Sequence, residues 1–304
     1  MKGQKIIVVG SSNTDMVVKS NHLPLPGETV LGEQFIMNPG GKGANQAVVA
    51  ARLGGDVAFV ARVGDDLFGK QAIEGFASHQ IDTQFITKDP HSASGVALIL
   101  VDQKGENSIS VALGANKNLQ KQHLEPVLPS LKPETFVLTQ LETPINTIEY
   151  LGELAEQRNL RLVLNPAPAQ QLSDKLLSSL YMLTPNELEA ELLSGVKVTD
   201  QASAQKAAIA LRNKGVSIVI ITMGSQGAYV LSDDLDELVP AIPAKVVDTT
   251  AAGDTFNGAL VVALNEDQNL KAAVQFANRA AAYSVGILGA QSSAPLRKDI
   301  ENQS

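Results

Sequence analysis

The segment GKGANQAVVAARLGGDVAFVARVG, residues 41–64, joins a helix pattern to a strand pattern with almost nothing between them. Small residues dominate its first half and predict a helix from about Lys42, while Gly54 and Gly55 are breakers of the kind expected after a last helical turn. VAFVARVG then has the length and the β-branched content of a buried strand. Another short apolar strand, IIVVG at residues 6–10, precedes the segment.

The same alternation continues along the rest of the chain. Asp65 and Asp66 open a helix that runs to about Gln80, because acidic residues suit a helix N-terminus. Further strands are expected at TFVLTQ (135–140), RLVLNP (161–166), YMLTPN (181–186) and SIVIITMG (217–224), and further helices near 145–158, 187–194, 202–214, 253–264 and 270–285. Strands rich in Val, Ile and Leu that alternate with helices indicate a mostly parallel sheet covered on both faces. The expected fold class is α/β, a three-layer doubly wound sheet in one domain over residues 1–304.

Two regions, about 14–38 and 94–113, are strand-like without a helix between their pieces. GVALILVD and NSISVAL are separated by the polar turn QKGE, which predicts a hairpin. Small polar and larger apolar residues alternate in SISVAL, which suggests a sheet with one covered face. Gly40, Gly41 and Gly114 stand at the ends of these regions, where hinges would be useful. We expect a small β-sheet lid, with rigid extra edge strands as the alternative.

Composition excludes several classes of protein. The 304 residues include no Cys and four His, so disulfide frameworks, thiolate metal sites and cysteine nucleophiles are ruled out and His-rich metal binding is disfavoured. The net charge of −8 argues against a generally basic nucleic-acid surface. No apolar stretch approaches the eighteen or so residues of a membrane helix, so no membrane partner is expected. The lack of Cys and of a signal-peptide core favours the cytoplasm.

The strongest chemical motif is DTTAAGDTFNGAL, residues 248–260. Ala251, Ala252 and Gly253 have little or no side chain and precede a helix, where backbone N–H groups can bind a phosphate at close range. Asp254 lies in the first turn and can take a proton from a hydroxyl that attacks phosphorus. The alternative is that Asp254 only stabilises the helix N-terminus.

A second glycine motif, NPGGKGANQA at residues 38–47, also precedes a helix. Its glycines permit close approach of a ligand, and Lys42 and Asn45 offer polar groups suited to a polyhydroxylated molecule. The spacing is not that of a P-loop, and no G-x-G-x-x-G follows a strand, which counts against a dinucleotide-binding protein. A plain glycine turn with a helix cap remains the alternative.

Three further motifs follow predicted strands, where ligands of open α/β sheets bind. GSSNTD (10–15) carries Asn13 and Asp15, which can hold sugar hydroxyls or form an Asx turn. TPNELEAE (184–191) places Asn186 and Glu189 one helical turn apart, where they could hold a hydrated Mg²⁺ or simply cap a helix with solvated acids. TMGSQG (222–227) is a glycine turn that could line a nucleotide or be an ordinary tight turn.

These motifs occur together in one order, and with QLE (140–142) and GAQSS (289–293) the chain resembles the ribokinase family of carbohydrate kinases over nearly its whole length. The family's two signatures correspond here to GGKGANQA and DTTAAGDTF, with Ala251 where many members have Gly. The resemblance implies ATP-dependent phosphorylation of D-ribose at its 5-hydroxyl, with ATP as co-substrate, Mg²⁺ and K⁺ as cofactors, and a homodimer formed through the lid sheets.

The resemblance also implies residue roles. Asp254 would be the catalytic base, and Ala251, Ala252 and Gly253 the anion hole. The residues expected to bind the sugar are Asn13, Asp15, Gly41, Lys42, Asn45, Glu142 and Asp254, with Ala97, Ile99 and Val111 as lid residues above it. Those expected to bind ATP are Asn186, Thr222, Gly224, Gly227, Gly253 and Asn278. K⁺ would be held by Asp248, Thr250, Ser284, Ile287, Gly289 and Ser293, and Mg²⁺ through water by Asn186 and Glu189.

Two other functions stay open. One is a related kinase, resembling a fructokinase or an adenosine kinase; Lys42, Asp15 and Glu142 favour ribose, and aromatic residues, which nucleoside sites tend to use, are only 4% of the chain. The other is a sugar-binding regulator without catalysis, since fold alone does not fix function. Such a regulator could lose Asp254 and its anion hole freely, yet both are intact.

Overall fold

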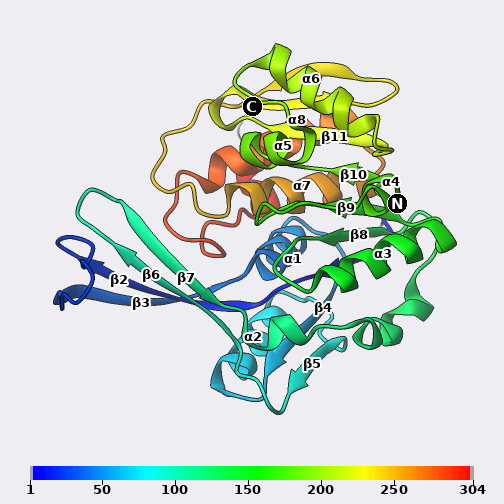
Figure 1. The fold of residues 1–304 in the computed structure, drawn as a ribbon. Coiled ribbons are helices and arrows are strands. Elements are labelled where there is room, and N and C mark those ends of the chain that lie inside the picture. Colours follow the sequence, from blue (N-terminus) through cyan, green and yellow to red (C-terminus); the bar gives the residue numbers. More distant parts are fainter. Residues whose placement is uncertain (1–2, 302–304) are drawn as a thin grey trace.

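The computed structural model describes residues 3–301, and its main body is a nine-stranded sheet between two layers of helices (Figure 1). In spatial order the strands are β13 (Asp236–Pro240), β12 (Gly227–Leu231), β11 (Ile218–Thr222), β10 (Met182–Leu183), β9 (Arg161–Leu164), β8 (Phe136–Thr139), β1 (Ile6–Val9), β4 (Val57–Gly64) and β5 (Ile86–Asp89). Neighbours from β5 to β11 pair in parallel, whereas β12 pairs antiparallel with both β11 and β13. The expected doubly wound, mostly parallel sheet is therefore confirmed.

Alternation along β1 divides the core into two layers. Ile6 and Val8 belong to one buried cluster, and Ile7 and Val9 to a second on the opposite face, because successive strand residues point to opposite sides. The helices that contribute to the first cluster are α1 (Lys42–Arg52), α2 (Leu67–Ser78), α7 (Ala252–Asn265), α8 (Leu270–Ser284) and α9 (Arg297–Glu301). Those that contribute to the second are α3 (Ile145–Arg158), α4 (Asp174–Ser178), α5 (Glu187–Ser194) and α6 (Gln201–Arg212). Short 3₁₀ turns add η1 (Gly114–Asn118), η2 (Lys121–His123), η3 (Glu125–Ser130) and η4 (Gly224–Gln226).

A separate four-stranded sheet projects from the body (Figure 1). Its order is β3 (Gly32–Gly40), β2 (Asn13–Ser20), β6 (Gly95–Val101) and β7 (Asn107–Ala112), with β2 and β6 parallel and the outer pairs antiparallel. These strands occupy the two regions expected to form the lid. The expectation of one covered face is wrong for the single chain, because all six residues of β7 are exposed. The sheet extends beyond the body, and no element of the body covers β7.

No helix between residues 3 and 301 is both long enough and apolar enough to span a bilayer.

Candidate active site

Asp254 lies in the first turn of α7 and is 5% exposed. Asn45 Nδ2 donates to its Oδ2 at 2.9 Å, and Gln46 Nε2 donates to its Oδ1 at 3.0 Å. Both donors come from α1, which packs directly against α7. The two glycine motifs of the sequence therefore meet, since one supplies the carboxylate and the other its hydrogen-bond donors.

The charges around Asp254 act in opposite directions. Burial raises the pKa of the Asp254 carboxyl, whereas the positive charge of Lys42 and the amide donors of Asn45 and Gln46 lower it, and burial prevails. For Lys42 the order is reversed: burial would lower the pKa of its ammonium, but Asp254, Glu142 and Glu189 together raise it. A buried carboxylate that remains near a fixed positive charge is suited to accept a proton from a hydroxyl.

The backbone before Asp254 leaves the start of α7 open. Ala251 is the residue that caps the helix and adopts a left-handed conformation (φ 60°, ψ 16°), and no side chain caps the first turn. A Cβ atom built on Gly253 would meet no atom within 4 Å. An uncapped helix N-terminus beside open space is suited to bind an anion. The Ala252 N–H donates to the Thr249 carbonyl at 3.2 Å. The anion hole expected at Ala251, Ala252 and Gly253 stays a prediction.

The residues expected to bind the sugar lie around the carboxyl end of β1 and the start of α1. Glu142 Oε2 accepts from Ser11 Oγ at 2.5 Å and from the Lys42 N–H at 3.0 Å, so this carboxylate joins the β1 loop to the helix start. On β2, Asn13 Oδ1 accepts from Asn116 Nδ2 at 2.8 Å, which leaves the Asn13 amide nitrogen as the free end of its side chain. Polar groups from four separate segments thus converge here.

The carboxyl of Asp15 also has a raised pKa. Burial, followed by the nearby carboxylates Glu142 and Asp254, raises the pKa of Asp15 to about 6. Asp15 pairs with Ala97 across the lid sheet, and Ala97 pairs with Val111, so the three side chains share a face; Ile99 follows two residues after Ala97 on that face. The lid residues named from the sequence therefore lie on the same side of the lid sheet as Asp15.

Two glycines allow β1 and α1 to approach so closely. A Cβ on Gly43 would lie 2.6 Å from the Ser11 nitrogen and 2.7 Å from Gly10 backbone atoms. Gly41, the residue before α1, has φ 91°, a conformation that favours glycine. Any larger residue at either position would push the helix start away from the strand end that carries Ser11 and Asn13.

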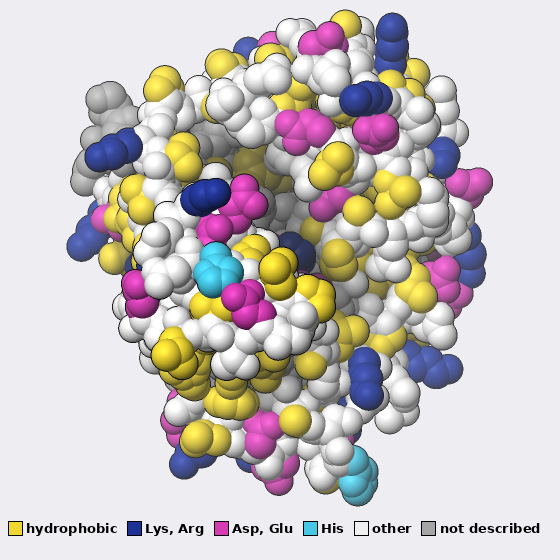
Figure 2. Space-filling view, turned by 60° about the vertical axis from the view of Figure 1, so that its left-hand side comes forward, with side chains coloured by type: hydrophobic (Ala, Val, Ile, Leu, Met, Phe, Trp, Pro, Cys, Tyr) yellow, Lys and Arg dark blue, Asp and Glu magenta, His cyan; other side chains and the backbone are white. Residues whose placement is uncertain are grey.

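A large cavity adjoins the start of α7. Its volume is about 820 Å³, and Ala252, Gly253 and Phe256 of α7 contribute to its wall. All six residues expected to bind ATP line it: Asn186, Thr222, Gly224, Gly227, Gly253 and Asn278. Apolar residues of the segment 241–246, among them Ile242 and Val246, form another part of its wall. The cavity has the size of a small-molecule site, and the space-filling view shows this side of the molecule hollowed between its upper and lower parts (Figure 2).

Asn186 and Glu189 cap α5. Asn186 Oδ1 accepts from the Glu189 N–H, and Glu189 Oε2 accepts from the Asn186 N–H, each at 2.9 Å. These two hydrogen bonds form a capping box, so the alternative in which the two residues cap a helix is correct. Its expectation that the acidic side chains are solvated is wrong for Glu189, which is 5% exposed. Burial raises the pKa of Glu189, and its Oε1 takes no part in the cap. Glu189 therefore keeps one oxygen for another partner while Asn186 faces the cavity.

The residues expected to hold K⁺ come from the loop before α7 and from the end of α8 with the loop after it, and the two segments meet at Asp248. Its Oδ1 accepts from the Thr250 N–H at 2.9 Å and its Oδ2 from the Gly289 N–H at 2.8 Å. Burial alone would raise the pKa of Asp248, but these donors lower it below the ordinary value. Ser284 and Ser293 are buried, and Ile287 N–H donates to the Ser284 carbonyl. The donor set is oxygen only, which fits a hard cation with loose geometric demands.

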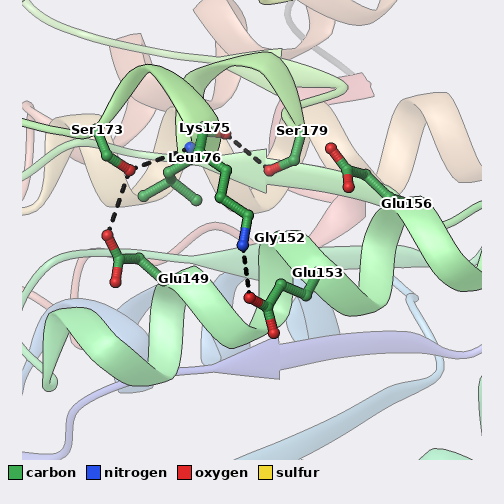
Figure 3. Close-up of a pocket in the computed structure, with 8 residues that line it drawn as sticks. All are labelled: Glu149, Gly152, Glu153, Glu156, Ser173, Lys175, Leu176 and Ser179. Carbon is green, nitrogen blue, oxygen red and sulfur yellow. Dashed lines mark hydrogen bonds and ion pairs between the residues drawn. The ribbon is translucent and has the colours of Figure 1, made fainter.

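A second hollow lies between α3 and α4, and none of the motif residues lines it (Figure 3). Glu149 accepts from Ser173 Oγ at 3.2 Å, and Lys175 Nζ lies 2.7 Å from Glu153 Oε1. The Lys175 side chain is 71% exposed, so this pair contributes little to stability. These contacts fasten the short helix α4 to α3, and nothing in the hollow resembles a reaction site.

Sequence reasoning did not single out four polar residues that hold the others in place. Ser11 binds Glu142, and Asn116 binds both Asn13 and the Ser12 backbone. Gln46 and Gln140 form a buried chain of amides that ends on Asp254. Gln46 and Gln140 stand inside GGKGANQA and QLE, so the motifs contained them, but their partners are 94 to 208 residues away along the chain.

Comparison with known proteins agrees with these observations. Residues 3–297 match a family described as pfkB family carbohydrate kinase. A ribokinase of Haemophilus influenzae is 43% identical over 294 residues, covering 97% of this chain and 96% of that protein. A deoxyribokinase of Salmonella typhi is 36% identical, with 95% of each chain covered. A solved structure of Arabidopsis thaliana ribokinase complexed with ribose and ATP superposes with a TM-score of 0.88 at 30% identity, covering 99% of this chain and 98% of that one.

Proposed function

Since this chain belongs to the pfkB family of carbohydrate kinases, we propose that it is a ribokinase, which transfers the γ-phosphoryl group of ATP to the 5-hydroxyl of D-ribose. The observation that carries the proposal is the position of Asp254. It contacts Asn45 of the polar cluster, and its neighbour Gly253 lines the 820 Å³ cavity. A sugar in the cluster and a nucleotide in the cavity would have their reacting ends on either side of this residue.

The proposed chemistry follows from these groups. Asp254 accepts the proton of the sugar hydroxyl as that oxygen attacks the γ-phosphorus in line, and the bond to the β-phosphate oxygen breaks to release ADP. The N–H groups at Ala251, Ala252 and Gly253 stabilise the negative charge on the transferred group. Asn186, Thr222, Gly224, Gly227 and Asn278 position the nucleotide in the cavity. Most of the rate enhancement would come from positioning and electrostatics.

We assign the two cations to the oxygen donors described above. Mg²⁺ would be held through its waters by Asn186 and Glu189 and would neutralise charge on the phosphates. Glu189 Oε1, which stands outside the capping box, supports this assignment. K⁺ would be held by Asp248, Thr250, Ser284, Ile287, Gly289 and Ser293. Because Asp248 already orders the loop before Gly253, a cation there would keep the anion-binding N–H groups in place.

Ribose is favoured as the substrate by the convergence of Asn13, Asp15, Lys42, Asn45 and Glu142, with Gly41 allowing the close turn. Each buried polar group needs a partner, and the four hydroxyls of ring-form ribose can be shared among these groups. Asn45 Oδ1 is buried without a partner among residues 3–301, which supports a ligand hydroxyl at that place. The deoxyribokinase among the relatives makes 2-deoxyribose the second candidate sugar.

We further propose that two copies pair through their lid sheets. Met37 and Leu98 pair with Met16 across the sheet and share a face with Phe35, opposite to the face of Asp15. All three are between 44% and 59% exposed, and hydrophobic side chains gather on the surface that Figure 2 brings forward. A second copy would cover this face, since apolar patches of this kind mark interfaces. A Leu98→Glu variant should sediment as a monomer.

A cytoplasmic location stays a prediction from composition.

A coupled assay of ADP release over D-ribose, 2-deoxyribose, fructose and adenosine tests the proposed function. We expect the highest kcat/KM for D-ribose. A tenfold preference for another substrate would overturn the ribose assignment and leave the family assignment standing. Sugar binding without ADP release from any of them would favour the non-catalytic regulator.

A further inference from the structure

A chain of buried side-chain amides lies beneath Asp254. Gln46 Nε2 donates to Asp254 Oδ1 at 3.0 Å and to Asn165 Oδ1 at 3.1 Å, and Gln46 Oε1 accepts from Gln140 Nε2. Gln46 and Gln140 are 0% exposed and Asn165 is 6% exposed. Three elements supply the chain: α1 holds Gln46, while the other two amides follow β8 and β9.

The partners of this chain fix which way each amide points. Asn165 Nδ2 donates to the Thr184 carbonyl at 3.2 Å, so its oxygen faces Gln46. Gln46 then has two acceptors on one side, and its own oxygen must face the donor of Gln140. The Gln140 side chain lies where Gly10 has no Cβ: a Cβ there would approach its Oε1 to 2.2 Å. Gln46 therefore presents a donor to Asp254 in an orientation that it cannot easily reverse.

The charged groups that face Asp254 are not enough by themselves to keep its carboxylate ionised. Lys42 of α1 is positive, whereas Asp15 of β2, Glu142 after β8 and Glu189 of α5 are negative. Three carboxylates and burial disfavour a fourth ionised carboxylate, so neutral donors are needed to keep it charged. Each Asp254 oxygen accepts from one amide, Asn45 on one side and Gln46 on the other, which also fixes the plane of the carboxylate.

We propose that Gln46 is a positioning residue for Asp254: its amide, anchored by Gln140 and Asn165, orients the carboxylate toward the acceptor hydroxyl and keeps it ionised. The inference rests on one part of the proposed function, namely that Asp254 is the base that accepts the proton of the acceptor hydroxyl. Asn45 also faces the sugar cluster, whereas Gln46 is wholly buried and acts through Asp254 alone.

The test compares Gln46→Met with Thr184→Val. Methionine has a similar length but donates no hydrogen bond. The Thr184 hydroxyl is an equally buried group that donates to Asn257 and does not contact Asp254, and valine keeps the backbone carbonyl to which Asn165 donates. We expect Gln46→Met to lower kcat by about tenfold or more, with KM for ribose and ATP changed by about twofold or less, because the base is misplaced and the binding groups are not. The acid limb of its kcat profile should move up by about one pH unit.

Thr184→Val should leave that acid limb in place even if the protein becomes less stable. Should Gln46→Met fail to fold, Gln140→Met tests the inference from the other end of the chain, with a smaller fall in kcat in the same direction. An unchanged kcat and acid limb in the Gln46 or Gln140 variant would overturn the inference, as would an equal shift in Thr184→Val.

A measurement without turnover separates this inference from the proposed function. The ¹³C resonance of the Asp254 carboxyl, assigned by its loss in Asp254→Asn, can be titrated in the substrate-free protein. We expect a higher pKa for Asp254 in Gln46→Met than in the wild type. Identical titrations would overturn the role of Gln46 even in an active kinase, and a clear shift would support it even if ribose proved not to be the substrate.

Discussion

The substitution Gly43→Ala probes the contact on which the sugar cluster depends. Gly43 lies in the first turn of α1, where a Cβ would stand 2.6 Å from the Ser11 nitrogen and 2.7 Å from Gly10 backbone atoms. All these atoms belong to the backbone, so no side chain can rotate away. The helix start must therefore retreat from the end of β1.

The cost can be worked out from the bonds that cross this contact. The Ala44 N–H donates to the Ser11 carbonyl at 2.8 Å, the Gly43 N–H to Ser11 Oγ at 3.3 Å, and the Lys42 N–H to Glu142 Oε2 at 3.0 Å. Overpacking costs about 1–3 kcal/mol. Each weakened neutral bond adds about 1 kcal/mol, and a bond to a charged group about 1.5–3 kcal/mol. We expect a loss of about 4.5–8 kcal/mol in the free energy of unfolding, together with a raised KM for ribose.

Gly75→Ala is the matched control. Gly75 lies in α2, and a Cβ there would meet no atom within 4 Å. In an open helical position the same change should stabilise the protein by about 0.5–1 kcal/mol. Urea unfolding followed by circular dichroism measures both variants, and a coupled kinase assay gives KM. A Gly43→Ala protein as stable as the wild type with an unchanged KM would refute the close-packing argument, as would equal damage from Gly75→Ala.

Three other predictions concern pH and salt. Because the pKa of Asp15 is about 6, KM for ribose should rise as pH falls below 6, by up to about tenfold per unit, and Asp15→Asn should remove this dependence. Burial and the nearby Arg62 guanidinium lower the pKa of His123, so the unfolded chain takes up protons more readily than the folded one. The free energy of unfolding should therefore fall as pH drops below 6.5, and it should fall less steeply in His123→Gln. Thermal unfolding at several pH values measures both. Potassium should raise kcat over tetramethylammonium at equal ionic strength, and equal rates would remove the ion from the Asp248 site.

Much of the fold follows from local sequence patterns. The helices expected at 145–158 and 187–194 agree with α3 and α5 at both ends, and the expected strand over residues 57–64 is β4. Local signals define these elements, because apolar periodicity and breakers act over a few residues. The strand expected over 181–186 is shorter, with only Met182 and Leu183 in the sheet. Asn186 caps a helix instead, after Pro185.

Other features depended on partners that the sequence does not reveal. The sequence patterns did not predict β12 and β13, although every residue of β12 is buried. The antiparallel position of β12 between β11 and β13 depends on pairing within the sheet, which local patterns do not show. The alternation in β7 predicted one covered face, but all six of its residues are exposed, because no element of the body packs on this strand. Motif types identified the residues around Asp254, whereas the amide chain through Gln46 required contacts between residues far apart in sequence.

Replacing Asp254 with Asn tests the central claim most directly. The side chain keeps its size but cannot accept a proton at neutral pH, and its NH₂ would face one of the donors of Asn45 or Gln46, so folding should be checked by thermal unfolding. We expect kcat to fall by about 10²–10⁴, while calorimetry gives dissociation constants for ribose and ATP within a few-fold of the wild type. A folded Asp254→Asn protein that phosphorylates ribose at a near wild-type rate would contradict the account.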